Sequence, residues 1–325
     1  MKALQYLNKY FLKYKYRLLL GVVITVLSNI LTLQVPHFIK ESVDVAEDYR
    51  IGIVTDLEIV KSDLLHNILL IVGAAFLSGF FTFLMRQLII VTSRLIEFDL
   101  KNEIYQQYQR LSLNFYKKNR TGDLMNRISE DVSKVRMYFG PAVMYFLNML
   151  VLFILAILKM YTIDPVLTLY TILPLPILSV SIYILSSIIH KRSTIVQQYL
   201  SKLTANAQEI FSGISIIKSY SVENKAILEF DQLSNEAKEK NIHLYKANAL
   251  FHPLMMLLIG LSNILVIYIG GLRYMEGHIS LGVIAEFIMY VNMLTWPVAV
   301  VGWVTSIVQE AEASQNRINE FLKIE

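Results

Sequence analysis

The stretch LLLGVVITVLSNILTLQVP, residues 18–36, decides the fold because it contains 19 consecutive residues without a formal charge. A bilayer core about 30 Å thick is crossed by about 20 predominantly apolar residues in a helix. Five more uncharged runs, of 19 to 26 residues, follow along the chain, so the sequence predicts six transmembrane helices. We expect the six spans at about residues 18–36, 67–90, 137–158, 165–189, 247–272 and 281–309.

The composition agrees with a membrane protein and argues against several other classes. Hydrophobic residues make up 55% of the chain and charged residues 17%, whereas about 25% of the residues in typical soluble domains are charged. Cysteine is absent, which excludes a disulfide framework and thiolate chemistry. The net charge of +4 is small, and no basic run is interleaved with aromatic residues in a polar segment, so we expect no binding of nucleic acid.

The charges between the runs predict the orientation in the membrane. When the gaps are assigned alternately to two sides, one side receives both termini and the two long gaps, residues 86–136 and 190–246. That side holds 25 of the 30 Lys and Arg residues. Cytoplasmic segments carry the excess of Lys and Arg in membrane proteins. We therefore expect a multi-pass protein of the inner (cytoplasmic) membrane with both termini in the cytoplasm.

The two long gaps are too polar to span a membrane and too patterned to be loops. Four apolar residues of the first gap repeat at helical spacing: Leu100, Ile104, Tyr108 and Leu111. Turn residues interrupt the first gap at about 119–122 and the second at 212–213, and helical character resumes after each break. The sequence thus predicts two cytoplasmic helical hairpins, whose arms of about 20 residues extend about 30 Å beyond the bilayer.

The N-terminal residues 1–17 place apolar side chains at helical spacing among lysines. These apolar residues are Leu4, Leu7, Phe11 and Leu12. The pattern predicts a short amphipathic helix at the membrane interface. A disordered basic tail is the alternative interpretation.

Sequence motifs of catalysis are absent. The chain has no G-x-x-x-x-G-K-[ST] phosphate loop, no H-E-x-x-H motif and no G-x-S-x-G motif, and its six His residues are scattered. We therefore predict no catalytic residue, no metal site and no cofactor held by this chain itself.

Two segments at the predicted hairpin tips are more specific. The first is SLNFYKKNRTGDLMNR, residues 112–127, and the second is EIFSGISIIKSYSVE, residues 209–223. Each places aromatic or aliphatic side chains far from the predicted bilayer, where apolar groups favour a partner surface. Both segments resemble the coupling-helix regions of ATP-binding-cassette (ABC) exporters of the multidrug and lipid half-transporter group.

The resemblance rests on four segments in register. Residues 112–127 match the family pattern S-x-x-F-Y-x5-G-D-L-M-[NS]-R, and residues 209–223 match E-x3-G-x3-I-K-x-[YF]-x2-E. Residues 280–297 resemble the family's sixth helix, and residues 311–322 resemble its connector to the nucleotide-binding domain. The resemblance implies an all-α membrane domain over residues 18–309, working as a domain-swapped dimer around a central cavity. Residues 310–325 would lead toward a nucleotide-binding domain that is absent from this sequence, because the chain is truncated or the ATPase is encoded separately.

The resemblance also implies which residues couple the membrane domain to ATPase domains. They lie at the two hairpin tips, and the second tip would reach the ATPase domain of the opposite subunit. The residues are Phe115, Tyr116, Gly122, Asp123, Arg127, Gly213, Lys218, Tyr220 and Glu223.

Polar and aromatic residues within the spans are candidates for a substrate cavity. Interhelical hydrogen bonds explain the amides equally well, and packing explains the aromatic residues. Glu286 is the ionisable candidate, and its position near the external start of the last span favours a solvated carboxylate. The candidates are Asn29, Asn263, Glu286, Tyr290, Asn292, Trp296 and Trp303.

The sequence therefore predicts the transmembrane half of an ATP-driven exporter. It would move amphipathic drugs, lipids or similar hydrophobic compounds out of the cytoplasm or inner leaflet by alternating access. Its partners would be the bilayer, a second half-transporter in a homo- or heterodimer, and nucleotide-binding domains that supply ATP and Mg. The alternative is a membrane scaffold or regulatory module without transport activity. A channel fits least, because no segment resembles a selectivity filter.

Overall fold

The computed structural model describes residues 3–324, apart from the side chains of Trp296, Val298 and Ala299. This part of the chain is almost entirely helical and contains no strand. Six helical stretches in it are long and apolar enough to cross a membrane, which confirms the predicted all-α fold with six spans. The stretches are Lys15–Arg50, Leu57–Arg110, Thr121–Ile163, Pro165–Ser212, Glu223–Met275 and Leu281–Leu322.

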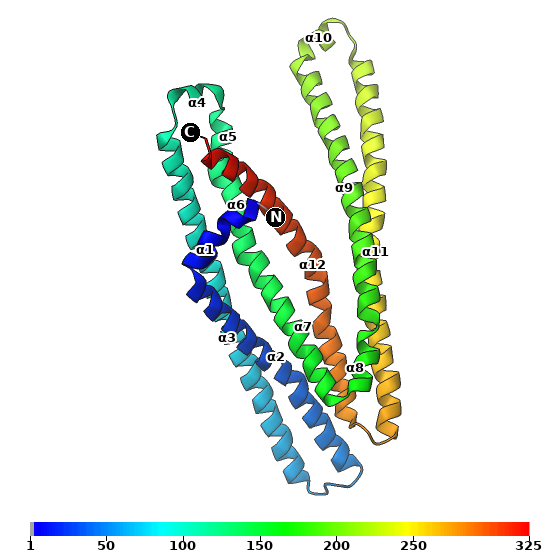
Figure 1. The fold of residues 1–325 in the computed structure, drawn as a ribbon. Helices are drawn as coiled ribbons and strands as arrows, with labels where there is room; N and C mark the ends of the chain where they lie inside the picture. Colours follow the sequence, from blue (N-terminus) through cyan, green and yellow to red (C-terminus); the bar gives the residue numbers. More distant parts are fainter. Residues whose placement is uncertain (1–2, 325) are drawn as a thin grey trace. The chain divides into compact units, whose positions relative to one another are not determined.

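Several stretches consist of more than one helix (Figure 1). The N-terminal segment contains the 3-10 turn η1 (Ala3–Leu7) and α1 (Asn8–Lys13). The other α-helices are α2 (Lys15–Arg50), α3 (Leu57–Arg110), α4 (Leu113–Lys118), α5 (Thr121–Asn126), α6 (Val132–Met137), α7 (Val143–Ile163), α8 (Pro165–Ile172), α9 (Pro174–Ser212), α10 (Ile214–Ser219), α11 (Glu223–Met275) and α12 (Leu281–Leu322). Two π-helical turns, η2 (Arg127–Asp131) and η3 (Tyr138–Ala142), flank α6.

Local chemistry explains several helix boundaries. The carboxylate of Asp56 caps the start of α3 by accepting a hydrogen bond of 2.9 Å from the backbone N–H of Glu58. Pro174 has no N–H with which to continue α8, so the fourth stretch is interrupted between Ile172 and Pro174. Pro141 has the same defect and lies within η3, where the helical hydrogen bonding is already displaced.

The helices form two compact units. The first unit comprises Met1–Thr171 and Leu265–Glu325, and the second comprises Ile172–Ile264. Helix α11 contributes residues to both.

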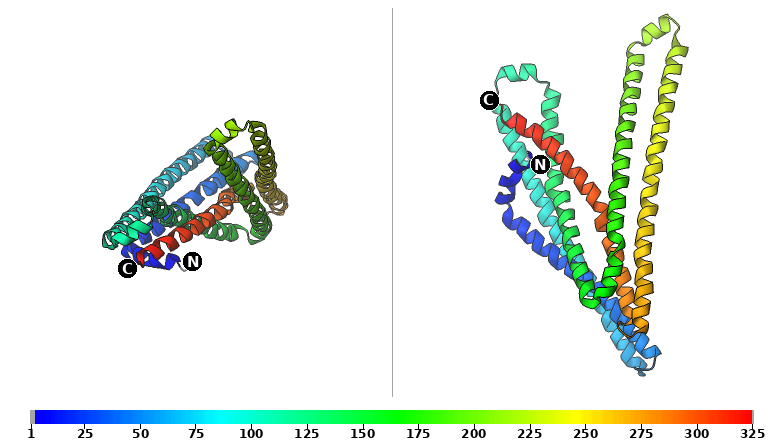
Figure 2. Two further views of the ribbon diagram at one scale, coloured as in Figure 1. Left: turned by 90° about the horizontal axis from the view of Figure 1, so that it is seen from above. Right: turned by 45° about the vertical axis from the view of Figure 1, so that its right-hand side comes forward.

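In the first unit, α2 and α3 form an antiparallel pair, and α12 packs along α2, α6 and α7 (Figure 2). The main core lies where the N-terminal segment meets α3, α6 and the end of α12. Its buried members are Leu4, Leu7, Tyr10, Ile96, Leu100, Ile104, Val132, Val135, Phe139, Ala311, Ile318 and Phe321. Leu4 and Leu7, predicted to face a membrane interface, are thus buried against protein, whereas Leu12 is exposed.

The opposite end of the first unit is held by Asp44 on α2. Its carboxylate accepts hydrogen bonds of 2.8 Å from the hydroxyl of Ser280 and from the backbone N–H of Gly282, at the start of α12. Lys40 lies 3.0 Å from the same carboxylate. A Cβ at Gly282 would overlap the carbonyl oxygen of Lys40, so only glycine allows the two helices this close approach. Asp44 therefore caps α12 from another helix.

The second unit is a long antiparallel hairpin of α9 and α11 with α10 at its tip (Figure 2). One cross-link between its arms is a hydrogen bond of 2.5 Å from the guanidinium of Arg192 to the carbonyl oxygen of His243. Val196, Ala237 and Ala247 are among its buried residues. Small side chains of this kind allow the two arms to approach closely.

Candidate functional site

The first hairpin tip is short helix α4 together with the start of α5. Helix α3 ends at Arg110 and α5 begins at Thr121, so the chain breaks on both sides of α4. The break predicted at 119–122 is therefore only part of the turn, and Gly122 lies inside the first turn of α5. A Cβ at Gly122 would meet no atom within 4 Å, so no packing requires glycine there.

Helix α4 is attached to the rest of its unit by its two adjacent aromatic residues. The ring of Phe115 lies 6.2 Å from the ring of Phe321, near the end of α12. Tyr116 packs edge-on against Phe115 and donates its hydroxyl hydrogen to the carbonyl oxygen of Tyr108 on α3. Phe115 thus anchors α4 inward, while Tyr116 keeps part of its surface exposed.

Asp123 and Arg127 form an ion pair one helical turn apart. The Arg127 nitrogen lies 2.9 Å from the Asp123 carboxylate, and its guanidinium stacks 5.6 Å from the ring of Phe321. Phe115, Tyr116, Asp123 and Arg127 are therefore brought together around the end of α12. Four of the five residues predicted at this tip therefore lie close together. The fifth, Gly122, has no side chain with which to contact them.

The second tip is α10, between Gly213 and Tyr220. Gly213 ends α9, and a Cβ there would lie 3.3 Å from the carbonyl oxygen of Glu209, an approach that requires a small shift of the backbone. Lys218 and Glu223 form an exposed ion pair of 3.0 Å across the end of α10. Tyr220 is 77% exposed, so its ring has almost no support within the described chain.

The apolar side chains of α10 also face solvent. Ile216 is 63% exposed and Phe211, just before the tip, is 73% exposed. No residue of α10 is buried. Exposed apolar groups gathered on one short helix are typical of a surface that binds another protein.

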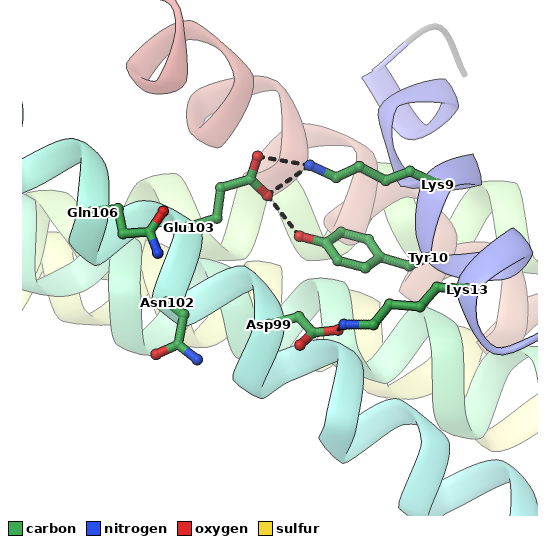
Figure 3. Close-up of a pocket in the computed structure, with 7 residues that line it drawn as sticks. All are labelled: Lys9, Tyr10, Lys13, Asp99, Asn102, Glu103 and Gln106. Carbon is green, nitrogen blue, oxygen red and sulfur yellow. Dashed lines mark hydrogen bonds and ion pairs between the residues drawn. The ribbon is translucent and has the colours of Figure 1, made fainter.

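A polar cleft beside the N-terminal segment was not predicted from the sequence. Figure 3 shows Lys9 and Tyr10 converging on Glu103 of α3, with Lys13 on Asp99 one turn away. Lys9 lies 2.6 Å from the Glu103 carboxylate, the Tyr10 hydroxyl donates to it at 2.6 Å, and Lys13 lies 2.6 Å from Asp99. These groups border a cavity of about 340 Å³.

The surroundings of the cleft raise the pKa values of Tyr10 and Lys9. Burial raises the pKa of the Tyr10 hydroxyl, and its hydrogen bond to Glu103 raises it further. Burial alone would lower the pKa of Lys9, but the hydrogen bonds to Glu103 and Tyr6 outweigh it, so this pKa is raised. Both shifts favour the protonated groups that hold the segment on α3.

The end of α12 is fixed at several points. Arg317 forms a two-pronged ion pair with Asp131 of η2, one prong being 3.0 Å long. The side-chain amide of Asn319 donates to the carbonyl oxygen of Ala3 at 3.0 Å. The amide of Gln107 donates to the carbonyl oxygen of Ile324 at 2.6 Å. The predicted connector is thus braced on η1, η2 and α3.

Among the candidate cavity residues, Asn29 joins helices. Its side-chain amide donates to Asn148 of α7 at 2.9 Å and to the carbonyl oxygen of Thr25 at 2.8 Å. It also borders a cavity of about 170 Å³ that includes Arg86 and Tyr145. Asn29 therefore has the interhelical bond that the alternative interpretation predicts.

Glu286 and Tyr290 form a buried pair on α12. Both side chains are fully buried, and the Tyr290 hydroxyl donates to the Glu286 carboxylate at 2.7 Å. His37 of α2 lies 3.4 Å from the same carboxylate oxygen. The expectation of a solvated carboxylate is therefore wrong, because α2 covers Glu286 and supplies these polar neighbours.

The remaining candidates lie apart. Asn263 belongs to the second unit, and Asn292 is exposed on α12. Trp303 is 46% exposed and packs edge-on against Tyr145 at 5.4 Å between ring centres. The side chain of Trp296 lies outside the described residues. The described members of the set do not converge on one cavity within the first unit.

The described side chains form no cluster suited to a metal ion. Within residues 3–324, no three His, Cys, Asp or Glu side chains are grouped so that they could hold a metal ion.

Comparisons with known proteins identify the family. A family model described as the ABC transporter transmembrane region matches residues 18–298. The multidrug resistance-like ATP-binding protein MdlA of Escherichia coli is 30% identical over 74% of this chain and 41% of its own length. The probable multidrug resistance ABC transporter ATP-binding/permease protein YheI of Bacillus subtilis is 27% identical over 99% of this chain and 54% of its own length.

The matches cover nearly all of this chain in some relatives but only about half of those relatives. The MdlA protein of Buchnera aphidicola (subspecies Baizongia pistaciae) is 27% identical over 99% of this chain and 54% of its own length. The chain thus spans about half the length of the curated relatives it matches. The match to the family model covers most of the chain and includes four of the six helical stretches completely, nearly all of the first and less than half of the last. The chain therefore belongs to the family of ABC transporter transmembrane regions.

Proposed function

We propose that the chain is the transmembrane half of an ATP-driven exporter. It moves amphipathic drugs, lipids or similar hydrophobic compounds out of the cytoplasm or the inner leaflet by alternating access. The observation that carries the proposal is the bare apolar surface of α10 at the end of a long hairpin, where Ile216 and Tyr220 are exposed. The relatives' printed names, which combine ATP-binding with multidrug resistance or export, support it.

In this proposal α4 and α10 have the same role, but α10 contacts the opposite half of the dimer. Each contacts a nucleotide-binding domain, and these domains bind ATP and Mg. The predicted coupling residues are the contacts, with Phe115 and Tyr116 on the first tip and Tyr220 on the second. Contact through α10 involves the domain that belongs to the second half-transporter of the dimer.

Long uninterrupted helices suit this mechanism. Helix α9 has 39 residues and α11 has 53. At 1.5 Å per residue they measure about 58 Å and about 80 Å. A rigid rod of that length converts a displacement at its tip into a displacement inside the bilayer. Both hairpin tips and both termini are cytoplasmic in this proposal, in agreement with the excess of Lys and Arg in these segments.

The test introduces a charge on α10 in the transporter supplied with its nucleotide-binding domains. Ile216→Glu places a carboxylate on the exposed apolar surface, and Leu228→Glu is the matched control on an exposed position of the arm. Efflux, measured as ATP-driven accumulation of dye inside inverted vesicles, and ATP hydrolysis are followed together. We expect Ile216→Glu to reduce efflux at least about tenfold while the basal ATPase rate is retained, because one buried charge costs several kcal/mol at an interface. Equal efflux in both variants would refute coupling through α10.

The substrate residues belong to the proposal as well. Asn29, Asn263, Glu286, Tyr290, Asn292, Trp296 and Trp303 remain the predicted lining of the translocation pathway. The scaffold alternative predicts neither efflux nor substrate-stimulated ATP hydrolysis when the ATPase domains are present, so the same assay separates the two.

A further inference from the structure

The first unit contains an apolar cavity that none of the predicted site residues lines. Its volume is about 500 Å³, within the range of about 300–1,000 Å³ typical of small-molecule sites. Helix α7 and helix α12 form its walls, with Phe146 and Met149 on one side and Val301 and Val304 on the other. None of the described residues that line it carries a charge.

Polar groups gather at one end of this cavity. Gln5 and Asn8 of the N-terminal segment and Tyr138 of η3 are lining residues. Among the described residues, the side chains of Gln5, Asn8 and Tyr138 make no hydrogen bond. Edge-on contact with Phe11 at 6.3 Å fixes the Tyr138 ring. Because Gln5 and Asn8 are exposed, the cavity has solvent-accessible hydrogen-bonding groups at one end and hydrocarbon along the rest.

The lysines nearest the cavity form ion pairs outside it. Lys9 and Lys13 lie on the same short segment as Gln5 and Asn8, but they are paired with Glu103 and Asp99 in the separate polar cleft (Figure 3). The polar end is thus rich in neutral donors and acceptors and lacks a free cation among its lining residues. An anionic head group would therefore find no cationic partner among the lining residues.

The length of the cavity matches one leaflet. From Tyr138 to Met149 the chain advances eleven residues along η3 and α7, which is about 16 Å at 1.5 Å per residue. Half of a hydrocarbon core about 30 Å thick is about 15 Å. A single chain lying along the cavity would therefore extend from the interface to the middle of the bilayer.

From these observations we infer that the cavity binds one single-chain amphiphile with an uncharged, hydrogen-bonding head group, such as a monoacylglycerol. The head group lies among Gln5, Asn8 and Tyr138, and the chain lies between α7 and α12. This inference rests on the proposed function, because it names the class of compound that the exporter takes from the inner leaflet.

The experiment uses this chain in phosphatidylcholine liposomes without nucleotide. The probe is a monoacylglycerol with a photoreactive diazirine in its acyl chain, and labelled residues are mapped by mass spectrometry. We expect saturable labelling on residues 143–149 and 301–308. Unlabelled monoacylglycerol competes, whereas lysophosphatidate of the same chain length, which differs by one phosphate, competes at least tenfold less well.

Two variants and one control test the two ends separately. Val301→Trp fills the apolar end at an exposed position and lowers labelling at least tenfold. The double variant Gln5→Ala, Asn8→Ala removes two hydrogen-bonding groups and weakens labelling by about tenfold. Val72→Trp, at a position on α3 that is also exposed (60%, against 47% for Val301), leaves labelling unchanged. Retained hydrogen-exchange protection of the backbone amides of residues 3–14 shows that the N-terminal segment of each variant is folded.

Three outcomes overturn the inference. Labelling spread evenly over exposed positions of α3 and insensitive to Val301→Trp shows ordinary contact with bulk lipid. Equal competition by lysophosphatidate shows that the head group is not selected for neutrality. Because the chain has no native cysteine, Val301→Cys gives a single thiol, and its quantitative cross-linking between two copies shows that a second copy covers the cavity. None of these readouts depends on ATP or on α10, so each is distinguishable from failure of the proposed export function.

Discussion

The two hairpin tips carry similar sequence signals but differ in how they are supported. Helix α4 is held by its own unit, since Phe115 packs near Phe321 and Tyr116 bonds to Tyr108. Neither short helix has a buried residue, but Tyr220, just after α10, is 77% exposed. The first tip is therefore positioned by contacts with its own unit, whereas the second leaves apolar side chains exposed. Similar sequence motifs at the two tips therefore do not indicate whether a tip is preformed.

The largest test of this difference removes the ring that supports α4. Phe321→Ala deletes a fully buried side chain in contact with Phe115 and Tyr108, and we expect a loss of about 3–5 kcal/mol in local stability. Hydrogen exchange should show faster exchange in α4 and unchanged exchange in α10. Phe211→Ala, at an exposed ring beside α10, is the control and should cost under about 0.5 kcal/mol. Equal effects of the two substitutions would contradict the comparison.

A second test compares two ion pairs. Asp131→Asn leaves Arg317 without its buried two-pronged partner, and we expect a cost of about 1–2 kcal/mol, seen as faster exchange in the last turns of α12. Glu223→Gln removes the exposed partner of Lys218 at the second tip and should have an effect below about 0.5 kcal/mol. A larger effect at Glu223 would mean that α10 is supported more than its exposure indicates.

A third test uses pH on the N-terminal segment. The pKa of Lys9 is raised above its ordinary value of 10.5, so its pairing with Glu103 stabilises the segment fully below that value. This contribution is lost as the pH rises through the raised pKa, and the raised pKa of Tyr10 acts in the same direction. After allowance for solvent screening the effect is below about 1 kcal/mol. Exchange rates of residues 3–14, corrected for intrinsic chemistry, should rise above pH 10.5 in the native chain and much less in Lys9→Met.

The smallest test concerns the glycines of the tips. Gly122→Ala adds a methyl group in open space inside α5, and we expect stabilisation by about 0.5 kcal/mol because alanine favours helix. Gly213→Ala brings its Cβ to 3.3 Å from Glu209 and should be neutral to slightly destabilising. Thermal unfolding of both variants measures the sign. Loss of efflux in Gly122→Ala without loss of stability would support direct contact with an ATPase domain at this glycine.

Much of the fold was predictable because bilayer thickness constrains sequence strongly. Uncharged runs such as residues 18–36 locate helices without any knowledge of tertiary contacts. The two hairpins were predictable for a similar reason, since their polar arms keep a helical period. The start of α5 was missed by two residues because Thr121 and Gly122 are turn residues that also fit a first helical turn.

The partners of polar side chains were not predictable in the same way. Tyr6, Tyr10 and Tyr14 recur every four residues, as do Lys9 and Lys13, and each series faces the acids of α3. That complementarity was visible in the sequence, but nothing local indicated that segments about 90 residues apart would meet. Glu286 illustrates the same limit, because its burial depends on α2 covering it.

The cap that Asp44 places on α12 has a consequence for the order of assembly. Its two bonds join residues 236 and 238 positions apart. During synthesis α2 is made well before α12, so the start of α12 is capped only after the long intervening stretch has been made. Contacts between residues so far apart in the sequence form late in folding and do little to speed it. A chain that stops before Ser280 would therefore keep a paired α2 and α3 but leave Asp44 without either of its α12 donors, and the accessibility of this carboxylate would distinguish molecules without α12 from molecules in which α12 has docked.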